Sequence, residues 1–475
     1  MKHAALLTPA DFSHVHKVHA IGIGGTVISG IAELLLGWGR KVSGSETTAN
    51  GKTEALSHRG ASVTISRKAV SLPPAADLVL VSPRAPRNHP DLIAAKQWGI
   101  PVVSAADMLG IISRLHDTIA VAGAHGKTTV AAYLGTLLAQ TGADPSVLVR
   151  SDVDVWAGNV RRGKGRYFIT EADENQRRFL SLSPTIALIM NIEADHLDYF
   201  KDLKAVIKAF HEFTHALPKE AVCIVNGDDP HIIEIVKRIR ARVIRFGRGD
   251  GMDVRAIGIE QGEKGVSFTV HVKKGEGDLQ ILLNLAGEHQ IMNALAVIAA
   301  AQALGIPLEQ AKEVLESYPG GKRHMEVLGE RDGVMVIDDA ADHPAEIKTV
   351  LKGIRSRYPE RKIWCIFQPY LENRTNYLLN EFAQSFTDAD RVFIMPIIKG
   401  VEEGGGETPS HALVEAAQKY HPFVSPVSPL KRGEGEGGVE VGVASEIFTQ
   451  LPAHSLLVTL GADPVRKIGE GYLAR

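Results

Sequence analysis

The sequence predicts an α/β protein with parallel sheets and about three folded units. Short β-branched runs alternate with longer amphipathic or alanine-rich segments along the chain, which is the pattern of strand–helix–strand units. The chain has 475 residues, and a prior of about 150 residues per domain gives roughly three domains. In addition, two glycine-rich turns each follow an expected strand and precede an expected helix.

The first unit is expected to open with a strand at residues 18–22 and a helix at residues 28–39. Its further strands are expected at residues 41–45, 62–65 and 78–82. His14, His16 and His19 alternate into the first strand, which favours solvated or half-buried strand positions over a metal site.

The second unit is expected to open with a strand at residues 118–122 and a helix from Lys127. Its further elements are strands at residues 167–171, 186–191 and 222–226 and a long buried helix at residues 287–305. The third unit is expected to contain strands at residues 334–338, 363–368, 392–395 and 456–460. We therefore expect domains that span residues 1–114, 115–318 and 319–475.

The composition excludes several classes of protein. Lys and Arg total 53 and Asp and Glu total 55, so a basic nucleic-acid surface is not expected. Two cysteines, Cys223 and Cys365, are too few for a disulfide framework. The apolar runs at residues 4–7 and 294–306 are too short for a secretory signal or a membrane span. We expect a cytoplasmic protein without membrane insertion. Residues 425–441 are rich in Pro, Gly and Glu, which is typical of a surface insertion.

The strongest chemical signal is a phosphate-binding turn between the strand at residues 118–122 and the following helix. Backbone N–H groups of such a turn can cradle phosphate at a helix N-terminus. Position 121 is Val where the usual spacing has another glycine, so the turn is the shorter G-x-x-G-K-T variant. The residues of this turn are Gly123, Ala124, His125, Gly126, Lys127, Thr128 and Thr129.

Acidic segments follow the next two expected strands of the same unit. Residues 171–174 read Glu-Ala-Asp-Glu, and residues 191–196 read Asn-Ile-Glu-Ala-Asp-His. The carboxyl ends of parallel strands meet at one edge of a sheet, where α/β proteins bind ligands. Carboxylates at this edge suit Mg²⁺, which prefers oxygen ligands, whereas His196 is a less obvious ligand.

The other glycine-rich turn lies at residues 22–30 and departs from the dinucleotide fingerprint, because Val27 occupies the third glycine position. This departure disfavours a nicotinamide-dependent oxidoreductase. The turn still predicts phosphate binding, and Ser45 and Glu46 can accept hydrogen bonds from a ribose or sugar. Candidate ligand residues here are Gly22, Gly24, Gly25, Ser29, Gly30, Ser45 and Glu46.

Taken in this order, the motifs resemble those of the Mur ligase family, and within it the alanine-adding branch. The resemblance covers nearly the whole chain, and it is the ordered set of motifs rather than one of them that is specific. It is carried by residues 22–30, 43–46, 123–129, 171–174, 191–198, 287–293, 321–323, 338–339, 343–344, 367–369 and 374–375.

The resemblance implies a Rossmann-like UDP-binding domain, a central P-loop ATPase-like domain and a C-terminal Rossmann-like domain. It implies ATP and Mg²⁺ as cofactors and UDP-N-acetylmuramate and L-alanine as substrates in peptidoglycan precursor synthesis. The implied reaction passes through an acyl phosphate that the alanine amine then attacks.

The resemblance also implies roles for individual residues. Lys127 would neutralise the β- and γ-phosphates. Thr128 and Glu174 would hold one Mg²⁺, and His196 would help to hold a second. The residues implied to contact the nucleotide or to take part in catalysis from later in the chain are Asn293, Arg323, Asp339, His343 and Arg374.

The departures from the family pattern concentrate where the incoming amino acid is expected. Ala340 and Asp342 replace an aromatic residue and a histidine, Tyr370 replaces another histidine, and Leu371 and Glu372 follow it. Added carboxylates and lost imidazoles should weaken the hold on an alanine carboxylate. Two alternatives therefore stay open: a murein-peptide ligase acting on the same UDP-sugar, and a nucleotide-binding paralogue with little or no ligase activity. The oligomeric state is not predicted.

Overall fold

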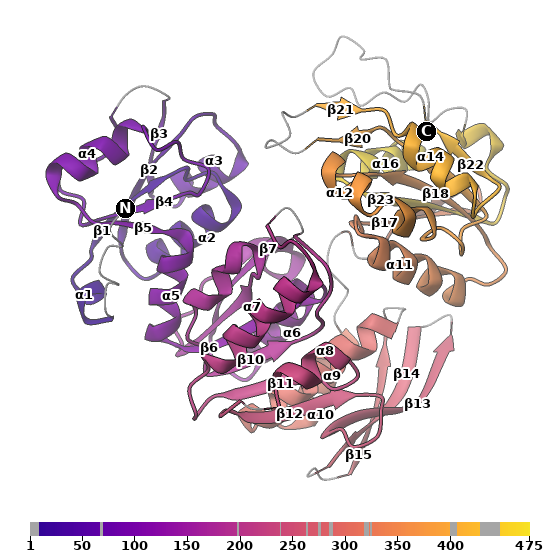
Figure 1. The fold of residues 1–475 in the computed structure, drawn as a ribbon, viewed down its shortest axis with the longest axis horizontal. Coiled ribbons are helices and arrows are strands. Elements are labelled where there is room, and N and C mark those ends of the chain that lie inside the picture. The colour runs from indigo at the N-terminus through magenta and orange to yellow at the C-terminus, as the bar shows by residue number, and fades with distance from the viewer. Residues whose placement is uncertain are drawn as a thin grey trace. The chain divides into compact units, whose positions relative to one another are not determined.

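The computed structural model describes most of the chain, and the fold is drawn in Figure 1. The described residues are 9–66, 70–196, 199–237, 239–262, 265–273, 277–284, 288–317, 323, 325–399, 406–427 and 447–475. Gly287, residues 321–322 and most of the low-complexity segment lie outside them. The chain divides into two compact units, one of residues 1–255, 271–279 and 292–315, and one of residues 256–270, 280–291 and 316–475.

The N-terminal sheet has five parallel strands in the order β3-β2-β1-β4-β5. The strands are β1 (Lys17–Ile21), β2 (Lys41–Glu46), β3 (Ser62–Ile65), β4 (Leu78–Val81) and β5 (Val102–Ser104). The helices are α1 (Pro9–Ser13), α2 (Thr26–Gly37), α3 (Gly51–His58), α4 (Pro90–Trp98) and α5 (Ala105–Leu115).

Alternate residues along the strands of this sheet face two different apolar clusters. Val18 and Ala20 of β1 pack with residues of α2, α3 and α5, whereas Ile21 packs with residues of α4. The period of two in the side chains thus places helices on both faces of the sheet. This doubly wound arrangement brings the glycine turn after β1 to the edge where such sheets bind ligands.

The central sheet has ten strands in the order β15-β14-β13-β12-β11-β10-β6-β9-β7-β8. The strands are β6 (Asp117–Ala122), β7 (Ser146–Val153), β8 (Gly158–Arg161), β9 (Tyr167–Ala172), β10 (Ile186–Ile189), β11 (Val222–Asn226), β12 (Arg242–Gly247), β13 (Val254–Gly262), β14 (Gly265–Val272) and β15 (Asp278–Leu283). Its helices are α6 (Lys127–Gln140), α7 (Leu203–His215), α8 (Pro230–Ile235), α9 (Glu288–Leu304) and α10 (Leu308–Ser317).

The middle of the central sheet is parallel, since β6 pairs in parallel with both β10 and β9. Phe210 and Phe213 of α7 and Ile232 of α8 pack in one apolar cluster with Ala187 and Ile189 of β10. The carboxyl ends of β6, β9 and β10 therefore meet at one sheet edge, with the phosphate turn at the end of β6.

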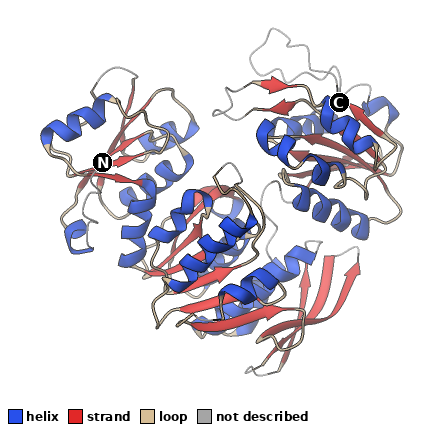
Figure 2. Cartoon of the chain, viewed as in Figure 1, coloured by secondary structure: helices blue, strands red, loops and turns tan. Residues whose placement is uncertain are grey.

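The C-terminal sheet has six strands in the order β16-β17-β23-β18-β19-β22. The strands are β16 (Glu326–Arg331), β17 (Val334–Asp339), β18 (Lys362–Gln368), β19 (Arg391–Ile394), β22 (Val424–Pro426) and β23 (Ser455–Gly461), and β20 (Ile397–Ile398) pairs with β21 (Glu407–Thr408). The helices, coloured blue in Figure 2, are α11 (Pro344–Arg357), α12 (Glu372–Tyr377), α13 (Leu379–Ala383), α14 (His411–Gln418) and α16 (Arg466–Leu473). Among the described residues, no helix has the length and apolar character needed to cross a membrane.

The α/β class is confirmed, and each strand and helix placed by residue range from the sequence is present with ends shifted by at most two residues. The N-terminal sheet is purely parallel as expected, whereas the central and C-terminal sheets are mixed, because β8 and β16 pair antiparallel to β7 and β17. Strands β5, β7, β8, β12 to β16 and β20 to β22 were not expected from the sequence.

The expected placement of the three N-terminal histidines is wrong for His19. His14 and His16 precede β1, whereas His19 lies within it and is 0% exposed. Its ring is hydrogen-bonded at both nitrogens, to Ser43 Oγ at 2.9 Å and to Asp91 Oδ2 at 3.1 Å. A polar side chain is tolerated at a buried position when its hydrogen bonds are satisfied, and sequence alternation alone does not reveal such partners.

Asp390 supplies a test of the C-terminal core through the pH dependence of stability. Partial burial raises its pKa, but hydrogen bonds from Lys362, Ile363 N–H and Arg355 outweigh burial and lower the pKa to about 2. A carboxyl group whose pKa is lower in the folded than in the unfolded state stabilises the fold at pH values above the unfolded-state pKa. This stabilisation is lost as the pH falls from about 4 towards 2.

Asp390→Asn is therefore expected to lower the free energy of unfolding by about 1–2 kcal/mol at pH 6. The difference from wild type should shrink as the pH is lowered through 4. Urea unfolding at several pH values measures it, with Asp388→Asn as the matched control, because only the backbone carbonyl of Asp388 contacts Arg355. A difference between wild type and Asp390→Asn that does not depend on pH would contradict this account.

Candidate functional site

The phosphate turn is held in an open conformation by two glycines and by one amide side chain. Gly123 and Gly126 have φ values of +134° and +84°, which side chains other than glycine rarely adopt. Asn191, at the end of β10, accepts the His125 N–H at 2.9 Å and donates to the His125 carbonyl at 3.1 Å. Gly126 precedes the first turn of α6, and no side chain caps that helix. The N-terminus of α6 is thus available to an anion.

Gly126→Ala is expected to impair the turn in two ways. The added Cβ would lie 2.5 Å from Asn293 Oδ1, and alanine would be strained at this φ by about 1–2 kcal/mol. We expect KM for ATP to rise tenfold or more. Gly142→Ala is the matched control, because Gly142 has φ +79° but no atom within 4 Å of the added Cβ. An equal KM for the two variants would contradict a specific role for the turn.

Lys127 lies at the centre of the site, beneath the turn. Its Nζ donates to the carbonyls of Gly123 and Ala124, the latter at 3.1 Å, and lies 3.5 Å from the carboxylate of Glu174. Burial alone would lower the pKa of Lys127, but the carboxylates of Glu174 and Glu171 outweigh it and raise the pKa above its ordinary value. The Lys127 side chain is therefore positively charged at neutral pH.

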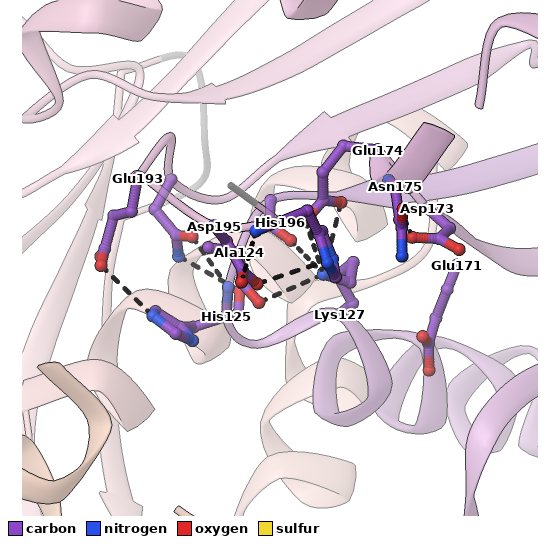
Figure 3. Close-up of polar contacts among 12 residues, drawn as sticks. Ala124, His125, Lys127, Glu171, Asp173, Glu174, Asn175, Glu193, Asp195 and His196 are labelled. Atoms are coloured by element: carbon purple, nitrogen blue, oxygen red, sulfur yellow. Dashed lines mark hydrogen bonds and ion pairs between the residues drawn. The ribbon is translucent and has the colours of Figure 1, made fainter. Parts of the chain in front are cut away.

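Glu174, Asp195 and His196 converge beside Lys127, as Figure 3 shows. His196 Nε2 lies 3.7 Å from Glu174 Oε1 and 3.6 Å from Asp195 Oδ2. One potential ligand atom from each of the three residues lies within 4.8 Å of the other two. His196 has φ +53°, a strained backbone conformation of the kind that concentrates at functional sites. The cluster can bind a divalent cation.

The Thr128 hydroxyl is hydrogen-bonded to Glu171, although the sequence predicted that Thr128 and Glu174 share a metal ion. Its hydroxyl donates to Glu171 Oε1 at 2.6 Å, and the same oxygen accepts the Arg150 N–H at 3.0 Å. Glu171 is the penultimate residue of β9 and is 7% exposed. Glu171 and Asp195 belong to the two acidic segments whose carboxylates were predicted to suit Mg²⁺, but neither residue was singled out. The available signal was their position at the ends of strands that neighbour the phosphate turn.

Three further predicted nucleotide contacts lie in or beside the turn. Asn293 on α9 lies close to Gly126, as the 2.5 Å approach of a built Cβ indicates. His125 Nε2 lies 3.3 Å from Glu193 Oε2, and this pair is separate from the cluster around Lys127 (Figure 3). Thr129 follows Thr128 in the first turn of α6.

In the second compact unit, Arg323 and Asp339 are both anchored within the C-terminal fold. The Arg323 guanidinium donates to Asp338 Oδ2 at 2.9 Å and to the Gly461 carbonyl at 2.6 Å. The two carboxylate oxygens of Asp339 accept the Met325 and Ala341 N–H groups, each at 2.7 Å.

The acidic residues that depart from the family pattern are each paired with a cation. Asp342 Oδ1 accepts from Arg374 at 3.0 Å, and Glu372 lies 3.0 Å from Lys399 Nζ. His343 caps the N-terminus of α11. The two added acids therefore repel a substrate carboxylate less than unpaired acids would, because their charges are compensated locally.

The N-terminal part of the chain contains a cavity of about 370 Å³ at the glycine turn. Of the candidate ligand residues, Gly22, Gly24, Gly25, Ser45 and Glu46 line it. Lining residues that the sequence analysis did not single out are Asn50, Ser82, Arg84 and His89, among others.

Ser29 and Gly30 do not line this cavity and lie buried in α2. A Cβ on Gly30 would lie 2.3 Å from Leu148 of β7. The glycine thus allows α2 to approach the strand closely, which is a packing role rather than the predicted ligand contact.

The chain is similar to known proteins along its whole length. Residues 17–117 match "Mur ligase family, catalytic domain", residues 121–301 "Mur ligase middle domain" and residues 323–432 "Mur ligase, glutamate ligase domain". The chain is 36% identical to the UDP-N-acetylmuramate–L-alanine ligase of Acetivibrio thermocellus, covering 100% of this chain and 98% of that protein. It is also 36% identical to the ligase of that name from Clostridium novyi, over 96% and 97% of the two chains.

Solved structures show the same fold. The UDP-N-acetylmuramate–alanine ligase of Thermotoga maritima matches with a TM-score of 0.76 at 22% identity, covering 97% of this chain and 98% of that one. A murein peptide ligase from Psychrobacter arcticus matches with a TM-score of 0.69 at 25% identity and the same coverage. With a phosphate turn, a carboxylate cluster beside it and three matched regions in order, the chain belongs to the Mur ligase family.

Proposed function

We propose that this protein is an ATP-dependent ligase that joins L-alanine to the carboxylate of UDP-N-acetylmuramate. The observation that carries the proposal is the convergence of Lys127 and His196 on Glu174 at the phosphate turn. It occurs in a chain that is 36% identical over its full length to a relative named for this activity. We also propose three domains at residues 1–114, 115–318 and 319–475, which the bounds of the three matched regions support.

The first step is attack of the muramate carboxylate on the γ-phosphorus of ATP. A carboxylate oxygen forms a bond to phosphorus, the bond to the β–γ bridging oxygen breaks, and ADP leaves. Both reactants are anions, so catalysis depends on positioning and on charge neutralisation. Lys127 is a partly buried cation at the turn that would cradle the phosphates, and it would move its donors from Glu174 and the turn carbonyls to phosphate oxygens.

The carboxylate cluster fits Mg²⁺, since Glu174 and Asp195 offer oxygen ligands within 4.8 Å of one another. We propose that Glu174, Asp195 and His196 hold Mg²⁺ together with the Thr128 hydroxyl. Bound Mg²⁺ would supply positive charge to the phosphate oxygens. Glu171, which accepts from Thr128, would orient that hydroxyl so that its lone pairs face the cation.

The second step is attack of the alanine amine on the acyl phosphate carbonyl. The C–N bond forms, the C–O bond to phosphate breaks, and the amine loses a proton. We propose that Arg323 and Arg374 contact phosphate and that His343 takes part in catalysis. Asn293 and Asp339 would contact the adenosine of ATP. The ion pairs Asp342–Arg374 and Glu372–Lys399 support an alanine substrate, because they leave no uncompensated charge from these two acids.

A panel of amines tests the proposal against the alternative of a murein-peptide ligase. The purified protein is incubated with ATP, Mg²⁺, UDP-N-acetylmuramate and one amine: L-alanine, glycine, L-serine or the cell-wall tripeptide. Mass spectrometry then identifies the ligated product. We expect the highest kcat/KM with L-alanine. A preference for the tripeptide would establish the alternative. Tight binding of ATP and of the UDP-sugar without any ligated product would establish a non-catalytic paralogue.

A further inference from the structure

A buried polar network lies directly beneath the N-terminal cavity. Its centre is Asp91 in the first turn of α4, which is 0% exposed. One carboxylate oxygen accepts from Ser45 Oγ at 2.8 Å, His19 Nε2 at 3.1 Å and Ser71 Oγ at 2.8 Å. The other accepts the backbone N–H groups of Ser71 and Leu72 at 2.7 and 2.9 Å. The network joins β1, β2, α4 and the segment before β4.

Asp91 acts only as an acceptor in this network. Burial alone would raise its pKa, but the hydrogen bonds from His19, Ser71 and Ser45 outweigh burial and hold the pKa well below its usual range. An ionised carboxylate has no proton to donate. The hydrogen bond between Ser45 and Asp91 therefore has one possible direction, with the Ser45 hydroxyl as the donor.

This direction determines what Ser45 can offer to a ligand. A serine hydroxyl has one hydrogen and two acceptor lone pairs. Its hydrogen is used by Asp91, and Ser45 also lines the cavity. The adjacent Glu46 lines the cavity as well and presents a carboxylate that accepts from the Gly24 N–H at 3.0 Å. The end of β2 consequently offers acceptors to the cavity.

We propose that Asp91 is a positioning residue that makes Ser45 a dedicated hydrogen-bond acceptor for an N–H or O–H donor of the UDP moiety. His19, on the neighbouring strand β1, is hydrogen-bonded to Asp91 through one ring nitrogen. Its other ring nitrogen lies 2.9 Å from Ser43 Oγ. In UDP the donors are the ribose hydroxyls and uracil N3–H. The inference rests on the proposed function, because that function places a UDP-sugar at this cavity.

Calorimetric binding of UDP to the full-length protein tests the inference without ATP or alanine. The probes are UDP, 2′-deoxy-UDP, 3′-deoxy-UDP and N3-methyl-UDP, each of which removes one donor. One lost hydrogen bond is expected to weaken binding about three- to tenfold. We expect one analogue to bind wild type that much more weakly than UDP. Ser45→Ala should bind UDP about three- to tenfold more weakly and should no longer distinguish that analogue from UDP.

Ser43→Ala is the matched control, since Ser43 lies two residues earlier on β2, contacts His19 and does not line the cavity. It should keep the wild-type discrimination among the analogues. If Ser45→Ala discriminates among the analogues as strongly as wild type, the inference is overturned while UDP binding still supports the proposed function. Absence of UDP binding to the wild type would instead count against the proposed function itself.

Asp91→Asn tests the positioning role separately from the contact. Its amide can donate to Ser45, which frees the Ser45 hydroxyl to act as a donor. In Asp91→Asn protein whose circular dichroism matches that of wild type, we expect the ratio of the dissociation constants of the analogue and of UDP to fall to near one. A folded Asp91→Asn protein with undiminished discrimination would overturn the role of Asp91. If this variant does not fold, the comparison of Ser45→Ala with Ser43→Ala decides the acceptor role of Ser45.

Discussion

Replacing Lys127 by methionine is expected to lower kcat for ADP formation by at least about 10²–10³-fold. Methionine keeps much of the length of the side chain but removes the cation that lies 3.5 Å from Glu174. Without it, the negative charge on the triphosphate and on the attacking carboxylate is no longer offset at the turn. Steady-state kinetics with saturating ATP measures the loss.

Lys204→Met is the matched control, because Lys204 is exposed in the first turn of α7. It should retain kcat within about twofold. A Lys127→Met protein with the wild-type kcat would show that the phosphate turn is not the site of ATP chemistry. Thermal unfolding of both variants separates a catalytic loss from a loss of folded protein.

Glu174→Gln is expected to raise the Mg²⁺ concentration for half-maximal activity and to lower kcat about 10²-fold or more. The substitution removes a charge that is 2% exposed and lies within ion-pair distance of both Lys127 and His196. Glutamine is a poorer ligand for a hard cation and cannot compensate either neighbour. A titration of activity against Mg²⁺ concentration gives both quantities.

The control for this variant makes the same chemical change outside the site. Glu212 on α7 pairs with Arg177, and Glu212→Gln should leave both the Mg²⁺ dependence and kcat near wild type. An unchanged Mg²⁺ dependence in Glu174→Gln would remove Glu174 from the proposed metal site. Asp195 would then be the next carboxylate to test.

The local parts of the site were predictable from the sequence. A glycine turn followed by Lys127 encodes its own geometry, because the positive φ of Gly126 and the start of α6 depend on adjacent residues. The strand ends at Glu171 and Asn191 were predictable for the same reason, since β-branched runs define strands with a period of two. These local signals were sufficient for the fold class and for the sheet edge that carries the site.

Contacts between distant segments were not predictable from the sequence. The bond from Thr128 to Glu171 spans 43 residues, and the bond from His19 to Asp91 spans 72. Each depends on which strands are neighbours, and a motif states a residue type without stating its partner. The same reason explains why Gly30 was assigned to a ligand although it packs against Leu148.

The net charge near the expected amino-acid site also differs between the sequence prediction and the structure. Asp342 and Glu372 were interpreted as added negative charge because they stand in motifs that have lost histidines relative to the family pattern. Their partners Arg374 and Lys399 lie 32 and 27 residues further along the chain. Whether an acid repels a substrate depends on such pairs, which only the folded chain brings together.

The most direct measurement of the central claim is ADP formation with each substrate omitted in turn. The account predicts rapid ADP formation when ATP, Mg²⁺, UDP-N-acetylmuramate and L-alanine are all present, because the acyl phosphate is then consumed by the amine. Without the UDP-sugar, ADP formation should fall to background. ADP that forms equally fast without UDP-N-acetylmuramate, or a complete mixture that consumes no ATP, would contradict the account.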